Sequence, residues 1–300
     1  MWKADRVDDK GKMDRKEAAE KALREGRSHF EFRPETRRFL LANAVNIAIG
    51  IALVIIAWWA VAEAMIAVRG AFFPTPPETF SALWEALGGA KINGATIYFH
   101  TRSSLVRWGL GYALALVIGT IAGMAFGTMG RAYDIGMVPV YIVQMIPGMA
   151  WVPIAMLIFG LGESATVFII LMTALPPIVI NTAGGIRQAP PIYSRVALMS
   201  GKDHFSLFAK VLIPAAALPI INGMRIGLAN GWRVLIAAEM VLGTMVGLGA
   251  TIEDSRYSLD FVSAFVCIIV ICLIGLTIEK LLFSGLEGVV RNRLGLEEEG

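Results

Sequence analysis

The segment RVALMSGKDHFSLFAKVLIP, residues 195–214, is a polar interval between two long apolar stretches. Apolar residues recur at helical spacing on both sides of Gly201, and Asp203 is placed to cap the second run. The segment therefore predicts two short helices that meet at a left-handed glycine. Their apolar side chains would lie in water unless another protein covers them, so we expect a soluble partner here. The alternative is a simple connector between two spans.

The rest of the chain has the composition of an integral membrane protein. Of its 300 residues, 56% are hydrophobic and 17% are charged, whereas soluble domains carry about 25% charged residues. A helix needs about 20 apolar residues to cross a bilayer. The long apolar intervals predict an all-α fold with six transmembrane helices: 39–62, 108–130, 135–162, 164–186, about 215–249, and 261–278.

These spans divide the chain into five parts. We expect a charged tail (1–38), a first transmembrane helix (39–68), a loop with an interfacial helix (69–100), a five-helix core that includes the polar segment 187–214 (101–286), and a second tail (287–300). With six spans, both termini share one side of the membrane. That side collects 20 of the 27 Lys and Arg residues, which predicts that it is cytoplasmic.

Prolines and charges within the spans predict a solute path. The third and fourth spans contain five prolines, which we expect to kink or unwind helices beside a cavity; the alternative is that transmembrane helices are simply rich in proline. The fifth span holds Arg225, Arg233 and Glu239, and a charge at mid-membrane costs at least about 3 kcal/mol. The candidate path residues are Met145, Pro147, Trp151, Pro153, Arg225, Arg233 and Glu239.

Two other interpretations of these charges stay open. Arg225 is close enough to the cytoplasmic end to extend its side chain to the membrane surface. Glu239 could be the buried structural partner of Arg233 or of a basic residue elsewhere. If the two arginines face a cavity, their positive field favours a small anion as solute.

Small residues recur every fourth position on two spans. They are Gly111, Ala115, Gly119, Gly123 and Gly127 on the second span, and Gly223, Gly227 and Gly231 on the fifth. Such stripes allow helix backbones to approach closely. We expect tight packing inside one bundle, with a homodimer interface on the stripe as the alternative.

The polar segment resembles a known signature. Ala197, Gly201 and the VLIP of residues 211–214 are similar to the cytoplasmic signature of permease subunits of binding-protein-dependent ATP-binding cassette (ABC) importers. The family pattern begins Glu-Ala-Ala, where this chain has Arg195, Val196 and Ala197. Four further segments, 72–87, 103–127, 146–165 and 223–241, resemble the taurine, sulfonate and nitrate branch of that family.

The resemblance implies a type I ABC importer permease fold in the bacterial inner membrane, with a cytoplasmic coupling helix. It implies a homodimeric pore, a pair of cytoplasmic ATPases, and a periplasmic or lipid-anchored binding protein that delivers taurine, an alkyl or aryl sulfonate, nitrate or a carboxylate-like solute. ATP and magnesium would be bound by the ATPase partner, with no cofactor in this chain. The residues implied to contact the ATPase are Arg195, Val196, Ala197, Met199, Gly201, Phe205, Phe208 and Pro214.

Other functional classes find less support in the sequence. An ion-coupled secondary transporter needs a carboxylate within the bundle, and Glu239 is the one deep candidate. An enzyme needs paired catalytic groups, which the spans lack. The sequence has no phosphate-binding glycine-lysine motif, no spacing typical of a metal site, and no sign of a nucleic-acid partner. We therefore expect neither catalytic nor metal-ligating residues.

Overall fold

The computed structural model describes residues 34–201 and 203–280 as parts of two units, 1–70 and 71–300. Almost all of the expected N-terminal tail and all of the C-terminal tail lie outside the described residues. The first unit contains helix α2 (Pro34–Arg69). Its segment Val45–Arg69 is apolar and long enough to cross a membrane, and nearly all of its described side chains are exposed. Such a helix is suited to contact with lipid or with other membrane helices.

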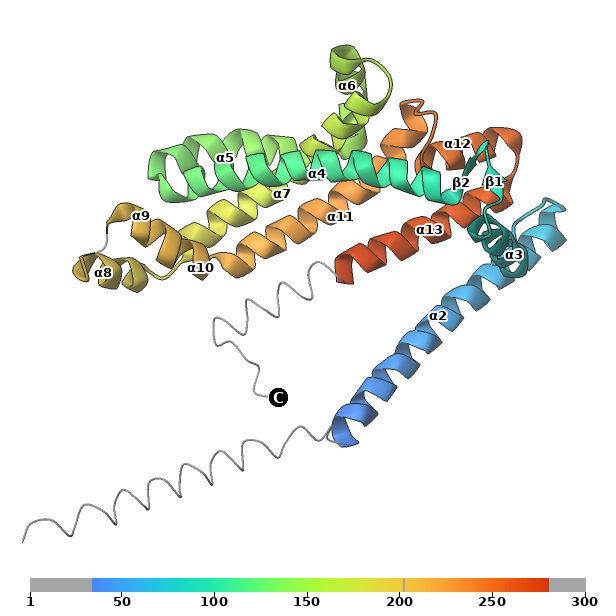
Figure 1. Ribbon diagram of the computed structural model, residues 1–300, viewed down its shortest axis with the longest axis horizontal. Coiled ribbons are helices and arrows are strands. Elements are labelled where there is room, and N and C mark those ends of the chain that lie inside the picture. Colours follow the sequence, from blue (N-terminus) through green and yellow to red (C-terminus); the bar gives the residue numbers. More distant parts are fainter. Residues whose placement is uncertain (1–33, 202, 281–300) are drawn as a thin grey trace, which may run out of the picture. The chain divides into compact units, whose positions relative to one another are not determined.

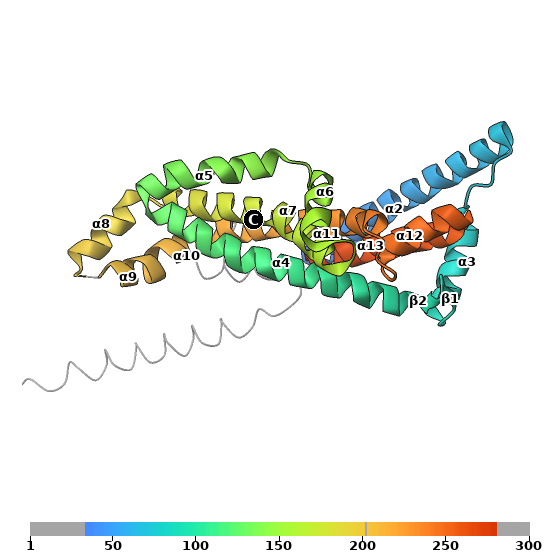
Figure 2. The same cartoon turned by 90° about the horizontal axis from the view of Figure 1, so that it is seen from above.

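The second unit is built around helix α7 (Glu163–Gln188), which packs against α4 (Ile97–Thr128) and α11 (Ala217–Val241). The three helices run side by side (Figures 1 and 2). A Cβ atom built on Gly123 would lie 2.6 Å from Thr182 Cβ, and one on Gly223 would lie 2.6 Å from Asn181 Cβ. Both small-residue stripes therefore face α7, which confirms tight packing inside one bundle.

The third expected span is not a continuous helix. Helix α5 (Gly130–Met145) ends at Ile146, and the short helices η1 (Gly148–Trp151) and α6 (Val152–Phe159) continue at 101° to it. Pro147 lies at the break, where it cannot donate a helical backbone hydrogen bond. The region predicted as the span 135–162 is therefore a bent pair of helices that can count as one broken span, and proline correctly signalled the break.

The fourth span shows the opposite behaviour. Pro176 and Pro177 are buried within α7, which continues unbroken through both. The prolines were expected to kink or unwind their helix, and unwinding does not occur here, where α7 packs between α4 and α11. These two prolines contribute to packing rather than to a cavity wall.

The boundaries of two other spans also differ from the prediction. Helix α4 begins at Ile97, before the expected position 108, because the charged Arg107 is buried within the bundle instead of ending the span. Helix α11 begins at Ala217, after a bend of 64° that separates it from the preceding helical segment. Among the described residues, four helices are long and apolar enough to span a membrane, or up to six if each bent pair is one span.

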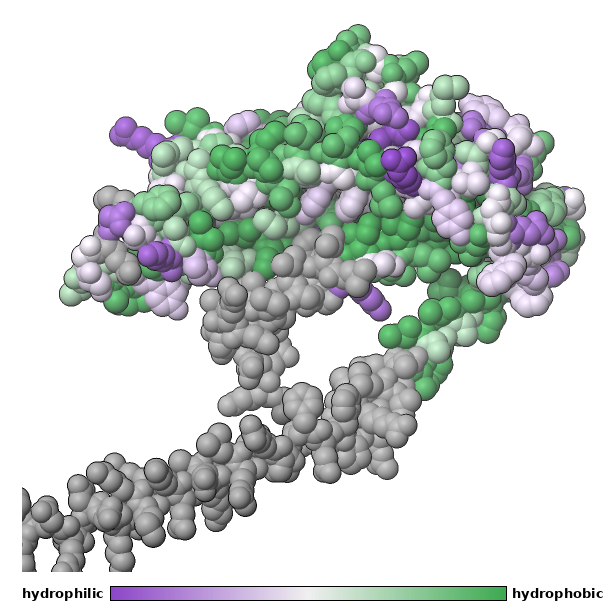
Figure 3. All heavy atoms as spheres, in the orientation of Figure 1, coloured by the Kyte–Doolittle hydropathy of each residue, from purple (hydrophilic) through white to green (hydrophobic). Residues whose placement is uncertain are grey.

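The remaining elements lie at the two ends of the second unit (Figures 1 and 2). One end carries α8 (Pro191–Met199), α9 (His204–Leu207), the π-helical η2 (Phe208–Leu212) and α10 (Ile213–Ala215). The other carries α3 (Pro76–Leu87), strands β1 (Lys91–Ile92) and β2 (Ala95–Thr96), and α12 (Leu248–Ser258). Helix α13 (Phe261–Glu279) packs against α3, α11 and α12. Strongly hydrophilic residues lie toward both ends, with a mainly hydrophobic surface between them (Figure 3).

Local chemistry explains the turns in the second group. Asn93 and Gly94 both have positive φ, at 49° and 84°, as the tight turn between β1 and β2 requires. The backbone N–H of Thr75 donates to the Glu78 carboxylate (3.0 Å) at the start of α3. Asp260 caps α13 by accepting a hydrogen bond from the Ser263 backbone (3.2 Å).

Candidate functional site

Residues 191–215, hereafter the coupling segment, contain α8 before Gly201 and the successive helical elements α9, η2 and α10 after it, in line with the helix–glycine–helix pattern that the sequence predicted. Gly201 has φ +72°, in the left-handed region that favours glycine. Asp203 follows it and caps α9. The Ser206 hydroxyl and the backbone N–H groups of Phe205 and Ser206 donate to the Asp203 carboxylate, and these hydrogen bonds lower the pKa of that carboxyl. The conformation of Gly201 and the hydrogen bonds of Asp203 therefore both favour this turn.

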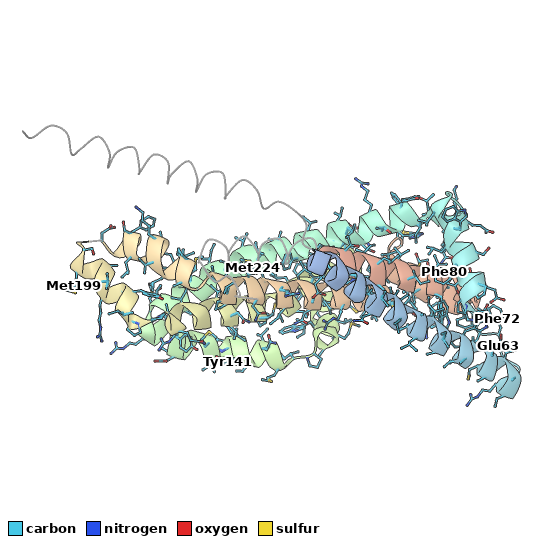
Figure 4. All side chains as sticks on the ribbon, turned by 90° about the horizontal axis from the view of Figure 1, so that it is seen from below. Glu63, Phe72, Phe80, Tyr141, Met199 and Met224 are labelled. Carbon is cyan, nitrogen blue, oxygen red and sulfur yellow. The ribbon has the colours of Figure 1, made fainter. Side chains whose placement is uncertain are left out.

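The coupling segment exposes large apolar side chains. Val196, Met199 and Phe205 are 55%, 89% and 76% exposed, and Met199 lies at the tip of this end of the molecule (Figure 4). Ala197 is buried, whereas Arg195 and Pro214 are exposed. The half-buried Phe208 packs against the cluster of Ile186, Ala216 and Ile220. Of the eight predicted contact residues, Ala197 and Phe208 thus face the protein. The exposed Val196, Met199 and Phe205 offer an apolar surface.

A hollow separates this surface from the end of α4. It has a volume of about 530 Å³ and is lined by Met124, Ala125, Thr128, Phe205, Leu207, Phe208 and Leu212. Phe205 borders the hollow and is also largely exposed. The second half of the coupling segment is therefore partly separated from α4 by this hollow.

The structure separates the candidate path residues into two groups. Met145, Pro147 and Pro153 are exposed at the break between α5 and α6. Trp151 is buried there, with its ring edge-on to Phe168 at a centroid distance of 6.2 Å. The charged candidates lie elsewhere, on α11.

Arg225 and Arg233 have different surroundings on α11. Arg225 forms an ion pair with Glu279 of α13 (3.2 Å). Arg233 is exposed and borders a hollow of about 390 Å³ between α11 and α13, which also includes Trp232, Gly275 and Glu279. Arg233 shares one exposed face of α11 with Asn222 and Ile226, because these residues are spaced at helical intervals.

Glu239 is buried and pairs with α4. Its Oε1 atom accepts from Arg107 Nη1 (2.7 Å), and the Ser104 hydroxyl donates to the carboxylate (2.9 Å). Arg107 also bonds Glu163 at the start of α7 (3.0 Å). The sequence left open whether Glu239 pairs with Arg233 or with a basic residue elsewhere. The structure shows the second alternative, with Arg107 as the partner.

Sequence reasoning missed Arg107 and Ser104. Arg107 was treated as the end of an apolar interval, although a single buried arginine is tolerated where an acidic residue faces it. The sequence feature that pointed to a buried arginine was Glu239, a lone acidic residue on another span that needed a basic partner. Among the described residues, no group of three or more His, Cys, Asp or Glu side chains could hold a metal ion.

Comparison with known proteins identifies the family of this chain. Residues 115–286, more than half of the chain, match the family model described as binding-protein-dependent transport system inner membrane component. The chain belongs to this family. It is therefore a multi-pass inner-membrane permease subunit of an ABC importer, and it works with an ATPase and a substrate-binding protein.

Several curated permeases are similar to this chain. The bicarbonate transport system permease protein CmpB of Synechococcus elongatus is 34% identical over 65% of this chain and 70% of its own length. The nitrate import permease protein NrtB of Synechocystis is 29% identical over 79% and 86%. The taurine transport system permease protein TauC of Escherichia coli is 28% identical over 78% and 86%. These relatives support the predicted branch of the family, and they give no support to a secondary transporter.

Proposed function

We propose that this permease conducts a small anion and that its coupling segment docks into a cytoplasmic ATPase. The observation that carries the proposal is the apolar surface of Val196, Met199 and Phe205 around the left-handed Gly201. A soluble protein that covers this surface would bury side chains that otherwise contact water. The coupling end then faces the cytoplasm, as the distribution of basic residues predicts.

Movement of the ATPase would reach the solute path through α11. The coupling segment ends with α10 and leads through a bend into α11, which carries Arg233 on an exposed face. ATP and magnesium would be bound by the ATPase, so this chain supplies a mechanical link and the path but no catalytic group. The ATPase would bind as a dimer, one subunit for each of two copies of the permease.

The anion is proposed from Arg233. An exposed arginine on a membrane helix needs water, a counter-charge or a partner chain around it. A second copy of this chain facing α11 would enclose Arg233 in a low-dielectric path, where its positive field attracts anions. The relatives are named for bicarbonate, nitrate and taurine, each of which carries an anionic group. A sulfonate, nitrate or carboxylate-like solute therefore fits this permease.

We propose that the opposite end faces the periplasm and receives the binding protein. Helix α3 would lie in the interface of the outer leaflet, with the strongly exposed Trp84 among lipid headgroups. Phe73, just before α3, packs edge-on against Phe265 of α13 at a centroid distance of 5.5 Å. This contact ties the region of α3 to the first turn of α13, where that helix would enter the membrane.

Reconstitution tests the proposal directly. The permease, its cognate ATPase and its binding protein are placed in liposomes, and ATP-dependent uptake of taurine, nitrate and bicarbonate is compared with uptake of a cationic amino acid. We expect ATP hydrolysis only with the ATPase present, and uptake of an anionic solute alone. Hydrolysis by the isolated permease would contradict the coupling role, and uptake of the cation would contradict the anion path.

A further inference from the structure

The start of α12 is held by buried polar side chains. The first backbone N–H groups of a helix have no acceptor within the helix, and here three successive ones are satisfied by side chains of α4 and α11. Gly247 N–H donates to His100 Nδ1 (3.3 Å), Leu248 N–H to Ser104 Oγ (2.9 Å), and Gly249 N–H to Glu239 Oε2 (2.9 Å).

The residues of α4 that take part in this network lie on one face of that helix. His100, Ser104 and Arg107 are spaced by four and three residues, which places them on the same side. Ser104 has a double role, because its hydroxyl accepts from Leu248 and donates to Glu239. We call His100, Ser104, Arg107 and Glu239 the α12 anchor.

The hydrogen-bond partners of His100 assign different roles to its two ring nitrogens. The backbone N–H of Gly247 can only donate, so Nδ1 of His100 accepts. The proton then lies on Nε2, which donates to the carbonyl oxygen of Ile92 (2.9 Å). The ring thus links α12 to strand β1 as well as to α4.

The packing around the anchor leaves no room for a Cβ atom at Gly247 or Gly249, on either side of Leu248. A Cβ atom on Gly247 would lie 2.6 Å from Glu239 Oε2, and one on Gly249 would clash with the carbonyl oxygen of Ile236. Glu239 is 1% exposed and Arg107 is 5% exposed, so both charges are withdrawn from water. Because a buried ion pair stabilises a protein no better than well-packed apolar residues do, stability alone does not account for it.

The place of the anchor on α11 gives it a role in transport. One end of α11 follows the coupling segment, and the other end carries Glu239 just before the loop 242–247. That loop exposes Met245 (92%) and leads directly into α12. Without the anchor, the loop and α12 could keep their position when α11 moves.

We propose that the α12 anchor makes the loop 242–247 and α12 move with α4 and α11 as one body during transport. Glu239 is then a positioning residue, which transfers movement from the coupling end to the opposite end of the path. This inference rests on the coupling role proposed above, because the movement it transfers begins at the ATPase.

The test measures the movement of the loop. Met245→Cys is introduced together with Cys272→Ser, and the complete complex with ATPase and binding protein is reconstituted in liposomes. The rate of labelling by a polar maleimide is compared without nucleotide and after trapping with ATP and vanadate. We expect the two rates to differ by at least about fivefold, as for a typical allosteric coupling.

Two variants interrupt the anchor in that background. Glu239→Gln keeps the size of the side chain but removes the charge that faces Arg107, and Ser104→Ala removes the acceptor of the Leu248 N–H. Both should bring the ratio of labelling rates close to one and reduce uptake, while the ATPase still co-purifies and hydrolyses ATP. Thr120→Ala, which removes a hydroxyl of α4 outside the anchor, is the matched control and should behave as the parent does.

The outcomes separate this inference from the proposed function. A parent complex without ATP-driven uptake contradicts the proposed function and, with it, the anchor. A parent that transports while Met245→Cys reacts equally in both states overturns the anchor alone, and so do variants with the parent's labelling ratio and uptake. If Glu239→Gln does not reach the membrane, Ser104→Ala decides the matter by the same criterion.

Discussion

The regions at the two ends of α11 both place polar residues within a mostly apolar protein, but their polar groups have opposite environments. At the coupling end, Gly201 has open space around it, and Met199 is almost fully exposed. At the anchored end, Glu239 and Arg107 are almost fully buried and paired with each other. One end thus exposes apolar side chains, whereas the other is satisfied within the chain. Under the proposed function, the ATPase would bind at the first end, and the second end would hold the shape of the permease.

The largest effect on stability is expected at the anchored end. Arg107→Met leaves the Glu239 carboxylate buried without its counter-charge, which should cost about 3–5 kcal/mol in the free energy of unfolding. Thermal unfolding in detergent, followed by size-exclusion chromatography, measures the loss. The double variant Arg107→Met/Glu239→Leu should recover most of it, because it removes both charges.

Arg225 provides the control for that comparison. Its ion pair with Glu279 is partly exposed, so Arg225→Gln should cost no more than about 1 kcal/mol. Equal losses for Arg107→Met and Arg225→Gln would show that the two ends of α11 do not differ in the way we describe.

The coupling end should lose function without losing its fold. Gly201→Val places a β-branched residue in a left-handed conformation, at a local cost of about 1–2 kcal/mol, and turns α9 away from its partner. We expect normal insertion into the membrane but no co-purification of the ATPase. Gly89→Val is a matched control, because Gly89 also has positive φ (+100°) and open space around it. Retention of the ATPase by Gly201→Val would make the segment a simple connector.

Arg233 should affect solute uptake rather than assembly. Arg233→Gln removes the positive charge from the exposed face of α11, and we expect anion uptake to fall by about tenfold, within the range by which electrostatic attraction changes association rates. Arg233→Lys should retain most of the uptake because it keeps the charge. Unchanged uptake by the Gln variant, with normal assembly, would remove Arg233 from the path.

The smallest effect concerns the cap of α9. Its hydrogen bonds lower the pKa of Asp203 in the folded state, so the cap contributes stability above the ordinary pKa of the carboxyl and loses it as the pH falls through the lowered value. Asp203→Ala should accelerate amide hydrogen exchange at Phe205 and Ser206 near neutral pH, and the difference from the wild type should vanish in strong acid. A difference that persists in acid would assign the protection to something other than this carboxylate.

The sequence predicted features that depend on local chemistry. Gly201 and Asp203 gave the turn of the coupling segment, because a left-handed glycine and a cap act over a few residues. The small-residue stripes predicted close packing for a similar reason. Neighbouring helices were not visible to this reasoning, so Pro177 was expected to kink or unwind a helix that stays helical between α4 and α11.

The candidate site was predicted less completely than the fold. Arg225, Arg233 and Glu239 were selected together as charges within a span, yet the structure gives each a different environment. Only three-dimensional packing brings Arg107 to Glu239, across 132 positions of the sequence. A rule that ends a span at every charge hides such pairs.

The central claim is that the coupling end of this permease is the surface that contacts the ATPase. Met199 and Met245 are equally suited to test it, because both are highly exposed and they lie beyond opposite ends of α11. A photoreactive benzoylphenylalanine is placed at each position in turn and activated in intact cells, and the cross-linked product is identified by mass spectrometry. We predict that position 199 captures the ATPase and position 245 does not. Capture of the ATPase from position 245, or its absence from the products at position 199, would contradict the account.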